Sequence, residues 1–276
     1  RWDIAAQPAR EGEYAPTVED CWFTATDGVA LHGWMCLPQQ MRGGKLVRVP
    51  SQTVLLFFHG NAGNITDRYE LIQKLTSVPA RVFIIDYRGY GRSQGSPSEQ
   101  GVYLDAQAAW KYLTNEQKIT PDRIVLFGES LGGAVAIDLA TKVNPAGLIT
   151  QSTFTSIPDM AAAVLPHVPS SLAGLLLHTK MDSVNKIGQI ACPKLMIHSD
   201  SDEVVPFGLG QQLFIAAAAP KQFHKVAGAG HNETDLVGGA EYLDAIAEFV
   251  HGLQEDLRPS GAPFDRGPVS VVPVRH

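Results

Sequence analysis

The sequence lacks the features that mark several large classes of protein. Its 22 Lys and Arg stand against 28 Asp and Glu, so the net charge is −6, with no basic excess of the kind that nucleic-acid-binding proteins carry. No apolar run approaches the roughly 20 residues that a membrane-spanning helix needs. We therefore expect neither a nucleic-acid partner nor a membrane span in this chain. Its oligomeric state is left open.

Cysteine is scarce as well. The chain has only three: Cys21, Cys36 and Cys192. That number does not suffice for a disulfide framework. Asp27-Gly28 predicts a two-residue hairpin turn, which would place Cys21 opposite Trp34 and leave Cys21 and Cys36 out of register. Since the chain also has no CxxC pair and no Cys/His cluster, we expect free, buried thiols and neither a metal nor a cofactor.

The sequence does contain a regular alternation of apolar runs and helical patterns. An alternating hairpin comes first, then a loop rich in Gly, Lys and Arg over 41–50. Five near-continuous apolar runs follow, as in strands buried on both faces of a parallel sheet: 53–60, 81–89, 124–130, 146–153 and 193–200. A final strand is expected over 223–228. Helical patterns separate most of them or follow the last: 67–75, 98–113, 131–143, 207–218 and 240–253. Ser96, Pro97 and Glu99 predict the start of the second helix, with Ser96 as its N-cap.

This order of elements predicts an α/β fold. We expect a mostly parallel, doubly wound sheet of about eight strands, with an antiparallel hairpin at the N-terminal end. Residues 1–254 should form a single domain. Residues 255–276 contain several prolines and glycines and little periodicity, which predicts an extended C-terminal tail.

The segment GESLGG joins an apolar strand directly to a helical pattern. By chance, Gly-x-Ser-x-Gly occurs in roughly one chain of this size in ten. Between a strand and a helix, however, the motif holds its serine on a strained turn with the hydroxyl above the sheet. We therefore predict that Ser130 is a nucleophile. The alternative is a simple turn at the entry to a helix.

A serine nucleophile needs a base that an acid orients. On such a sheet the expected chain order is serine, then Asp or Glu, then histidine. We predict Asp202 in HSDSDEVVP as the acid and His231 in AGAGHNETD as the base. Asp200 is the alternative carboxylate, although its position is typical of a residue that shapes a turn. The alternative for His231 is an ordinary surface-loop histidine.

The reaction also needs donors for the negative oxygen that develops. The backbone N–H of Leu131 is one candidate, and the N–H of Asn61 in FFHGNAGN is the other. HGNAGN lacks the spacing of a phosphate-binding loop. We expect His59 to order this loop, and Arg88 and Arg92 to hold another loop through backbone carbonyls.

Six motifs lie in order between about Asp20 and Leu253: HGNAGN, DYRGYGRSQGSPSE, GESLGG, TFTSIPDMA, DSDEVVP and GHNET. Together they resemble the α/β-hydrolase superfamily, in particular the branch of the bud-emergence (Bem-type) hydrolases and the eukaryotic protein depalmitoylases. The resemblance implies an α/β-hydrolase fold and a serine hydrolase with a Ser130–Asp202–His231 triad. The hydrophobic anchor and cysteine-rich leader of those relatives are not seen. Since the sequence begins at Arg1, such a segment could precede it, and the cytoplasm is only slightly favoured as the compartment.

We expect hydrolysis of carboxylic esters of short to medium acyl chains through an acyl-enzyme intermediate. The alternatives are an acyl-protein thioesterase, a serine peptidase and, least favoured, a non-catalytic binding protein of the same fold. The interval 154–192 must supply an ordinary crossover helix, and its roughly 40 residues leave room only for a minimal cap. Four apolar residues of this interval are predicted to contact the acyl chain: Val164, Leu165, Leu172 and Leu176.

Overall fold

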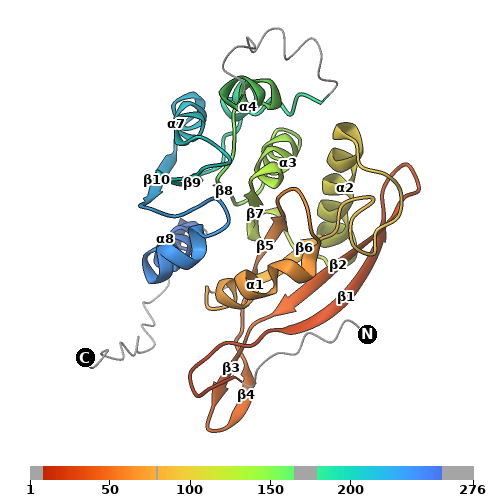
Figure 1. Ribbon diagram of the computed structural model, residues 1–276. Helices are drawn as coiled ribbons and strands as arrows, with labels where there is room; N and C mark the ends of the chain where they lie inside the picture. The colour runs from red at the N-terminus through yellow and green to blue at the C-terminus, as the bar shows by residue number, and fades with distance from the viewer. Residues whose placement is uncertain (1–8, 79, 165–178, 257–276) are drawn as a thin grey trace.

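The computed structural model describes residues 9–78, 80–164 and 179–256 (Figure 1). Its main sheet has eight strands in the order β1-β2-β6-β5-β7-β8-β9-β10. The strands from β5 to β10 run parallel, whereas β1 and β2 are antiparallel. Their bounds are Thr17–Thr24 (β1), Ala30–Leu37 (β2), Thr53–Phe58 (β5), Ala80–Ile85 (β6), Ile124–Glu129 (β7), Gly147–Gln151 (β8), Lys194–Ser199 (β9) and Lys221–Val226 (β10). The predicted fold class is confirmed.

Helices cover both faces of this sheet (Figure 1). On one face lie α1 (Tyr69–Leu75) and α8 (Thr234–Asp256). On the other lie α2 (Glu99–Lys111), α3 (Leu131–Ala140), α6 (Val184–Ile187) and α7 (Phe207–Ala216), with α4 (Ile157–Val164) packed beside them. Short helical turns occupy Ile65–Arg68 (η1), Tyr112–Glu116 (η2) and Pro121–Arg123 (η3).

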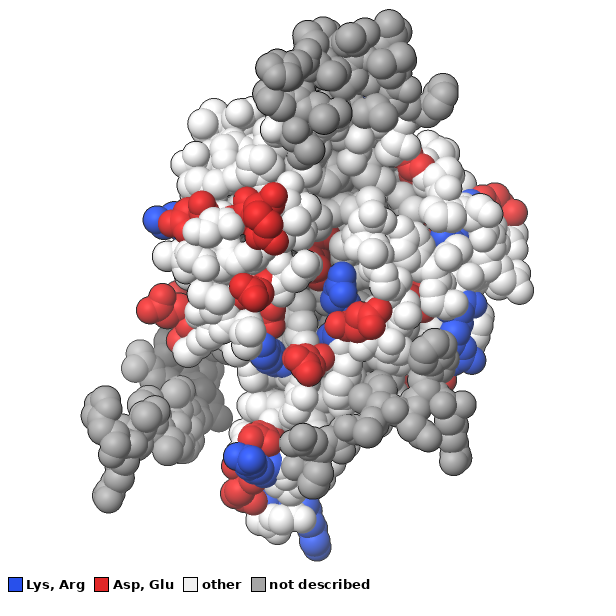
Figure 2. Space-filling model, in the orientation of Figure 1, with Lys and Arg blue, Asp and Glu red and all other residues white. Residues whose placement is uncertain are grey.

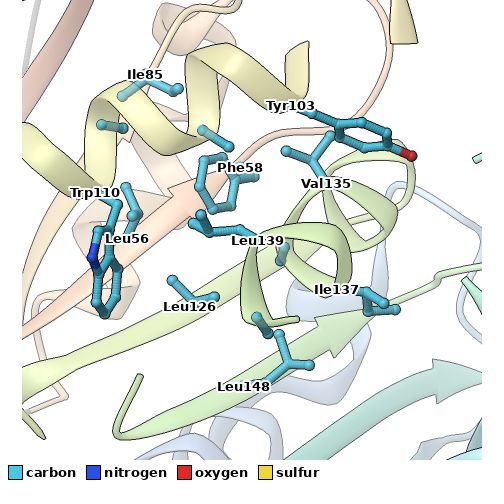
Figure 3. Packing of buried hydrophobic residues seen from close by; sticks show 14 of the residues in the cluster. Leu56, Phe58, Ile85, Tyr103, Trp110, Leu126, Val135, Ile137, Leu139 and Leu148 are labelled. Carbon is cyan, nitrogen blue, oxygen red and sulfur yellow. The ribbon is translucent and has the colours of Figure 1, made fainter. Parts of the chain in front are cut away.

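The continuous apolar runs are explained by two cores, one on each face of the sheet. Along β5, Leu56 and Phe58 pack with α2 and α3, while Leu55 and Phe57 pack with α1 and α8. Figure 3 shows the first layer, where Trp110 of α2 lies near Leu56. Complete burial of such a side chain stabilises the fold by about 1.5–3 kcal/mol. These layers hold the carboxyl ends of the parallel strands along one edge.

The N-terminal hairpin differs from the prediction by one residue. The amide of Ala25 donates to the carbonyl of Val29, so the turn has three residues and not two. Gly28 within it has a φ of 88°, which a residue with a side chain rarely adopts. Cys21 consequently faces Gly33 and not Trp34. All three cysteines are nevertheless free thiols, and Cys21 and Cys36 are buried as expected, whereas Cys192 is only partly buried.

The predicted loop over 41–50 is wrong. Gln39–Arg42 (β3) and Lys45–Arg48 (β4) pair as a separate two-stranded hairpin. Gly43 and Gly44 form its turn with φ values of 57° and 73°, as a type I′ turn requires. The hairpin projects from the lower end of the molecule in Figure 1.

The N-cap of α2 is Ser98, not Ser96. Its side chain accepts a hydrogen bond from the amide of Gly101 at 3.1 Å. The carboxylate of Glu99 accepts from the amides of Lys180 and Met181 instead of closing a capping box. A contact distant in the sequence therefore takes the side chain that the local pattern assigned to the cap.

The ends of the chain and its surface complete the fold. The division into a domain of 1–254 and a tail of 255–276 stays a prediction, since 257–276 lie outside the described residues. Among the residues that the structure describes, no helix has both the length and the apolar character that crossing a membrane requires. On the face in Figure 2, acidic side chains gather over the side formed by α7, β10 and α8.

Candidate active site

Ser130 lies on the turn between β7 and α3, at the carboxyl edge of the sheet. Its backbone is strained, with φ 53° and ψ −115°, a conformation that costs about 1–3 kcal/mol in a residue other than glycine. The turn can be this tight because residue 132 is a glycine. A Cβ at Gly132 would overlap the backbone carbonyl of Phe58. The amide of Ser130 donates to the carbonyl of Gln151 at 2.8 Å, which ties the turn to β8.

His231 and Asp202 come to the same edge from the loops after β10 and β9. His231 Nε2 lies 3.1 Å from Ser130 Oγ. On the other side of the ring, Nδ1 lies 2.8 Å from Asp202 Oδ2. With Nδ1 protonated and donating to the carboxylate, Nε2 accepts from the serine hydroxyl. This arrangement can move a proton from the hydroxyl to the imidazole. The structure thus brings the three predicted residues together, and their catalytic roles stay a prediction.

The structure also distinguishes the two candidate carboxylates. Asp200 accepts hydrogen bonds from the amide of Gly228 and from Lys225, and it makes no contact with His231. Its contacts are those of a residue that shapes a turn, as its position in the sequence indicates. The Asp202 side chain is fully buried beside the imidazole.

Asp202 is held as a carboxylate. Burial raises its pKa, but hydrogen bonds from His231 and from the amides of Val205 and Val204 outweigh burial, so the pKa lies below its ordinary value. The charged form is the one that can stabilise a protonated imidazole. The amide of His231 itself donates to Glu203 at 3.0 Å, which fixes the loop that carries the ring.

The loop with Asn61 passes beside the nucleophile. A Cβ built on Gly60 would lie 3.4 Å from the Cβ of Ser130. Leu131 is the first residue of α3, and the first amides of a helix have no acceptor within it. The side chain of Asn61 accepts from the hydroxyl of Tyr90 at 2.7 Å, which holds the residue in place. Donation by the two amides to an oxyanion stays a prediction.

His59 is buried at the start of this loop. Its Nδ1–H donates to the carbonyl of Gly60 at 2.7 Å. The hydroxyl of Tyr87 donates to the backbone carbonyl of His59 at 2.9 Å. Burial lowers the pKa of His59 to about 4, so the ring is neutral near pH 7. These contacts agree with the predicted role of ordering the loop.

The predicted contacts of Arg88 and Arg92 are wrong in kind. Arg88 donates to the carboxylates of Asp27 and Asp105, at 2.7 and 2.8 Å. Arg92 lies 3.2 Å from the carboxylate of Asp20. Both arginines do anchor a loop, but they do so through carboxylates, of which Asp105 is buried while Asp20 and Asp27 are exposed. Carboxylates match a guanidinium better than carbonyls do.

Sequence reasoning missed the ion pair between Arg68 and Glu129. Arg68 Nε donates to Glu129 Oε2 at 3.0 Å. Burial raises the pKa of Glu129, and the nearby Arg68 opposes that rise. A charged residue within the apolar run IVLFGES was the available signal, because a buried carboxylate calls for a partner.

The predicted acyl contacts cannot be placed. Leu165, Leu172 and Leu176 lie outside the described residues, as does the side chain of Val164, the last residue of α4. The described parts of the connection between β8 and β9 include α4 and α6. Within the part of the chain that the structure describes, no group of three or more His, Cys, Asp or Glu side chains is suited to a metal ion.

Comparison with known proteins shows which family this sequence resembles. Residues 49–182 match the family described as serine aminopeptidase, S33. The chain is 36% identical over 258 residues to the alpha/beta hydrolase domain-containing protein WAV2 of Arabidopsis thaliana, covering 87% of this chain and 80% of that protein. It is 39% identical over 206 residues to protein bem46 of Schizosaccharomyces pombe, covering 72% and 68%.

Among solved structures, the Pyrococcus furiosus esterase Pf2001 resembles this fold with a TM-score of 0.68 at 20% identity, covering 86% of this chain and 91% of that one. At this identity the likeness shows the fold alone.

Proposed function

The chain belongs to the α/β-hydrolase superfamily, in its Bem-type branch of serine hydrolases, and on that premise we propose that it hydrolyses carboxylic esters of short to medium acyl chains. The observation that carries the proposal is the chain of hydrogen bonds from Asp202 through His231 to Ser130, at 2.8 and 3.1 Å. That chain begins at a carboxylate and ends at a hydroxyl on a strained turn, as nucleophilic catalysis by serine requires.

The reaction proceeds in two halves. Ser130 Oγ attacks the ester carbonyl while His231 Nε2 takes its proton and then passes it to the leaving alcohol. Asp202 accepts from Nδ1–H and stabilises the protonated ring. The amides of Asn61 and Leu131 donate to the oxyanion. Water then attacks the acyl-enzyme with His231 as the base. These groups complete the reaction, and we expect no metal or cofactor.

The preference for short chains follows from the small interval between β8 and β9. A separate cap domain does not fit in its roughly 40 residues once a crossover helix is supplied. We propose that Val164, Leu165, Leu172 and Leu176 form a short apolar wall along an open cleft. Each further methylene contributes about 0.8 kcal/mol only while it stays buried. The wall therefore favours acyl chains that end within it.

A series of p-nitrophenyl esters from acetyl to palmitoyl tests this proposal. We expect kcat/KM to be highest between acetyl and hexanoyl, to fall for longer chains, and to show no activation at lipid interfaces. A maximum at palmitoyl esters or thioesters would contradict the proposal and favour an acyl-protein thioesterase.

A serine peptidase is the second candidate, because the matching family is described as serine aminopeptidase. Amides have a poorer leaving group than esters, so a peptidase must protonate a leaving amine efficiently. Hydrolysis of aminoacyl p-nitroanilides at rates comparable to the best ester would favour this candidate. Turnover of esters alone would support the esterase. Absence of any turnover and of labelling by a fluorophosphonate would leave the non-catalytic binding protein.

A further inference from the structure

One ion pair connects the two segments that carry the proposed oxyanion donors. Arg68 ends the short turn η1, which continues the loop that bears Asn61. Glu129 is the last residue of β7 and directly precedes Ser130 and Leu131. Arg68 Nε donates to Glu129 Oε2 at 3.0 Å. The pair therefore spans from the oxyanion loop to the nucleophile turn, across 61 positions of sequence.

Both side chains of this ion pair are largely buried. The side chains are 18% and 9% exposed, so water compensates their charges poorly. Among the residues that the structure describes, neither side chain has another hydrogen-bond partner. Loss of one charge would leave the other buried alone. The geometry of this contact is consequently held by the two side chains themselves.

The other end of the oxyanion loop also lies near Glu129. A Cβ on Gly60 would lie 3.2 Å from Glu129 Oε1 and 3.4 Å from the Cβ of Ser130. One carboxylate thus accepts from Arg68 through Oε2 and has its Oε1 beside the space at Gly60 that a side chain would occupy. Asn61 lies between Gly60 and Arg68 in the sequence. Movement of the Glu129 side chain would change where the Asn61 amide stands relative to the Leu131 amide.

We propose that Arg68 and Glu129 are positioning residues that fix the distance between the two oxyanion donors. The inference rests on the proposed serine-esterase function. A displacement of about 1 Å in such a site can lower the rate about 100-fold, because the donors must meet the oxyanion of the transition state. Binding of the uncharged ester depends much less on these amides, so kcat should change and KM should not.

Variants at both positions test the pair. The set is Arg68→Gln, Glu129→Gln and the double variant, with Arg68→Lys as the conservative change. Asp27→Asn is the matched control, because it removes another ion pair, with Arg88 at 2.7 Å, from a turn outside the site. The double variant leaves no lone buried charge, so it keeps the test decisive where a single variant fails to fold. Circular dichroism and thermal unfolding identify the folded variants.

With p-nitrophenyl butyrate, we expect each folded single variant to lose about 10- to 100-fold in kcat, with KM unchanged within about twofold. Because the two residues act as one unit, the double variant should be no worse than the worse single variant. Arg68→Lys should recover part of kcat. A trifluoromethyl ketone, which forms a tetrahedral adduct with the serine, should lose affinity in parallel with kcat.

Each contrary outcome points to a different failure. If the wild-type protein neither turns over esters nor reacts with a fluorophosphonate, the proposed function fails and the positioning role falls with it. If the wild-type protein is active and the folded variants match Asp27→Asn, only the positioning role is overturned. A rise in KM with unchanged kcat and unchanged affinity for the ketone also overturns it.

Discussion

His231 and His32 are both buried against carboxylates, and of these two only His231 faces a nucleophile. His231 has Asp202 at Nδ1 and the hydroxyl of Ser130 at Nε2. His32 has Asp20 Oδ1 2.7 Å from Nε2 and Asp86 Oδ2 3.4 Å from Nδ1. A ring between an acid and a hydroxyl can take up a proton and release it elsewhere. A ring with carboxylates on both sides has no hydroxyl to activate.

Their places in the sheet strengthen this difference. His231 follows β10, at the edge where the parallel strands end, beside the turn after β7. His32 lies within the antiparallel strand β2, and two strands, β6 and β5, separate it from β7. The ring of Trp22 lies against it, with ring centroids 4.9 Å apart. We therefore propose catalysis for the first cluster and stability for the second, and three of the four predictions below test that division.

The largest effect should come from the hydroxyl that His231 faces. Ser130→Ala should abolish labelling by a fluorophosphonate and lower kcat by a factor on the order of 10⁶, as loss of a serine nucleophile does elsewhere. Ser152→Ala is the matched control, because Ser152 also has a positive φ of 50° but is fully buried. It should keep its labelling. Stoichiometric labelling of folded Ser130→Ala would show that another residue is the nucleophile.

The next effect concerns the acid. Asp202→Asn should stabilise the wrong tautomer of His231 and lower kcat by about 10⁴-fold. Asp200→Asn, which changes a carboxylate of the same loop that does not touch the ring, should cost far less. Steady-state kinetics of the two variants decide between them. The reverse ranking would mean that the geometry at 2.8 Å is not the catalytic one.

These two clusters also show what a sequence can predict. Ser130 could be predicted as a candidate from the sequence because strand, glycine spacing and helix are contiguous around it. Asp202 and His231 could be predicted as its neighbours because parallel strands end at one edge of the sheet, so the loops that follow these strands lie side by side. The fold class followed from the same alternation of strands and helices.

Contacts between residues far apart in the sequence could not be predicted in this way. Glu129 and Arg68 meet only because β5 lies beside β7, and His32 meets Asp86 only because β2 lies beside β6. Sequence alone does not give the strand order that makes these pairs. The register of the first hairpin failed for a local reason, since Asp27-Gly28 fits a two-residue turn and a three-residue turn equally well.

A smaller effect is expected from another buried histidine, His59. Its pKa is lowered to about 4, whereas a histidine in an unfolded chain has a pKa of about 6.5. Between these values the unfolded chain binds a proton that the folded chain does not. The free energy of unfolding should therefore fall as the pH drops through this window, with a total contribution of about 3 kcal/mol.

Urea unfolding from pH 4 to 7 measures this contribution. Burial also lowers the pKa of His198, so the quantity of interest is the difference between His59→Asn and the parent protein. The variant should show the shallower dependence on pH. His251→Asn, which removes an exposed histidine of α8, is the matched control. Equal slopes for the His59 variant and the parent protein would contradict a neutral, buried His59.

The smallest effect on activity, and the sharpest test of the comparison, is expected from His32→Asn. The side chain is 1% exposed, and its loss leaves Asp86 buried with one donor fewer. A hydrogen bond to a charged group contributes about 1.5–3 kcal/mol, so the free energy of unfolding should fall by about that amount. Because no reacting group touches His32, kcat/KM on p-nitrophenyl butyrate should stay within about twofold of the parent value at temperatures where the variant is folded. A loss of activity far beyond the unfolded fraction would mean that the second cluster takes part in catalysis.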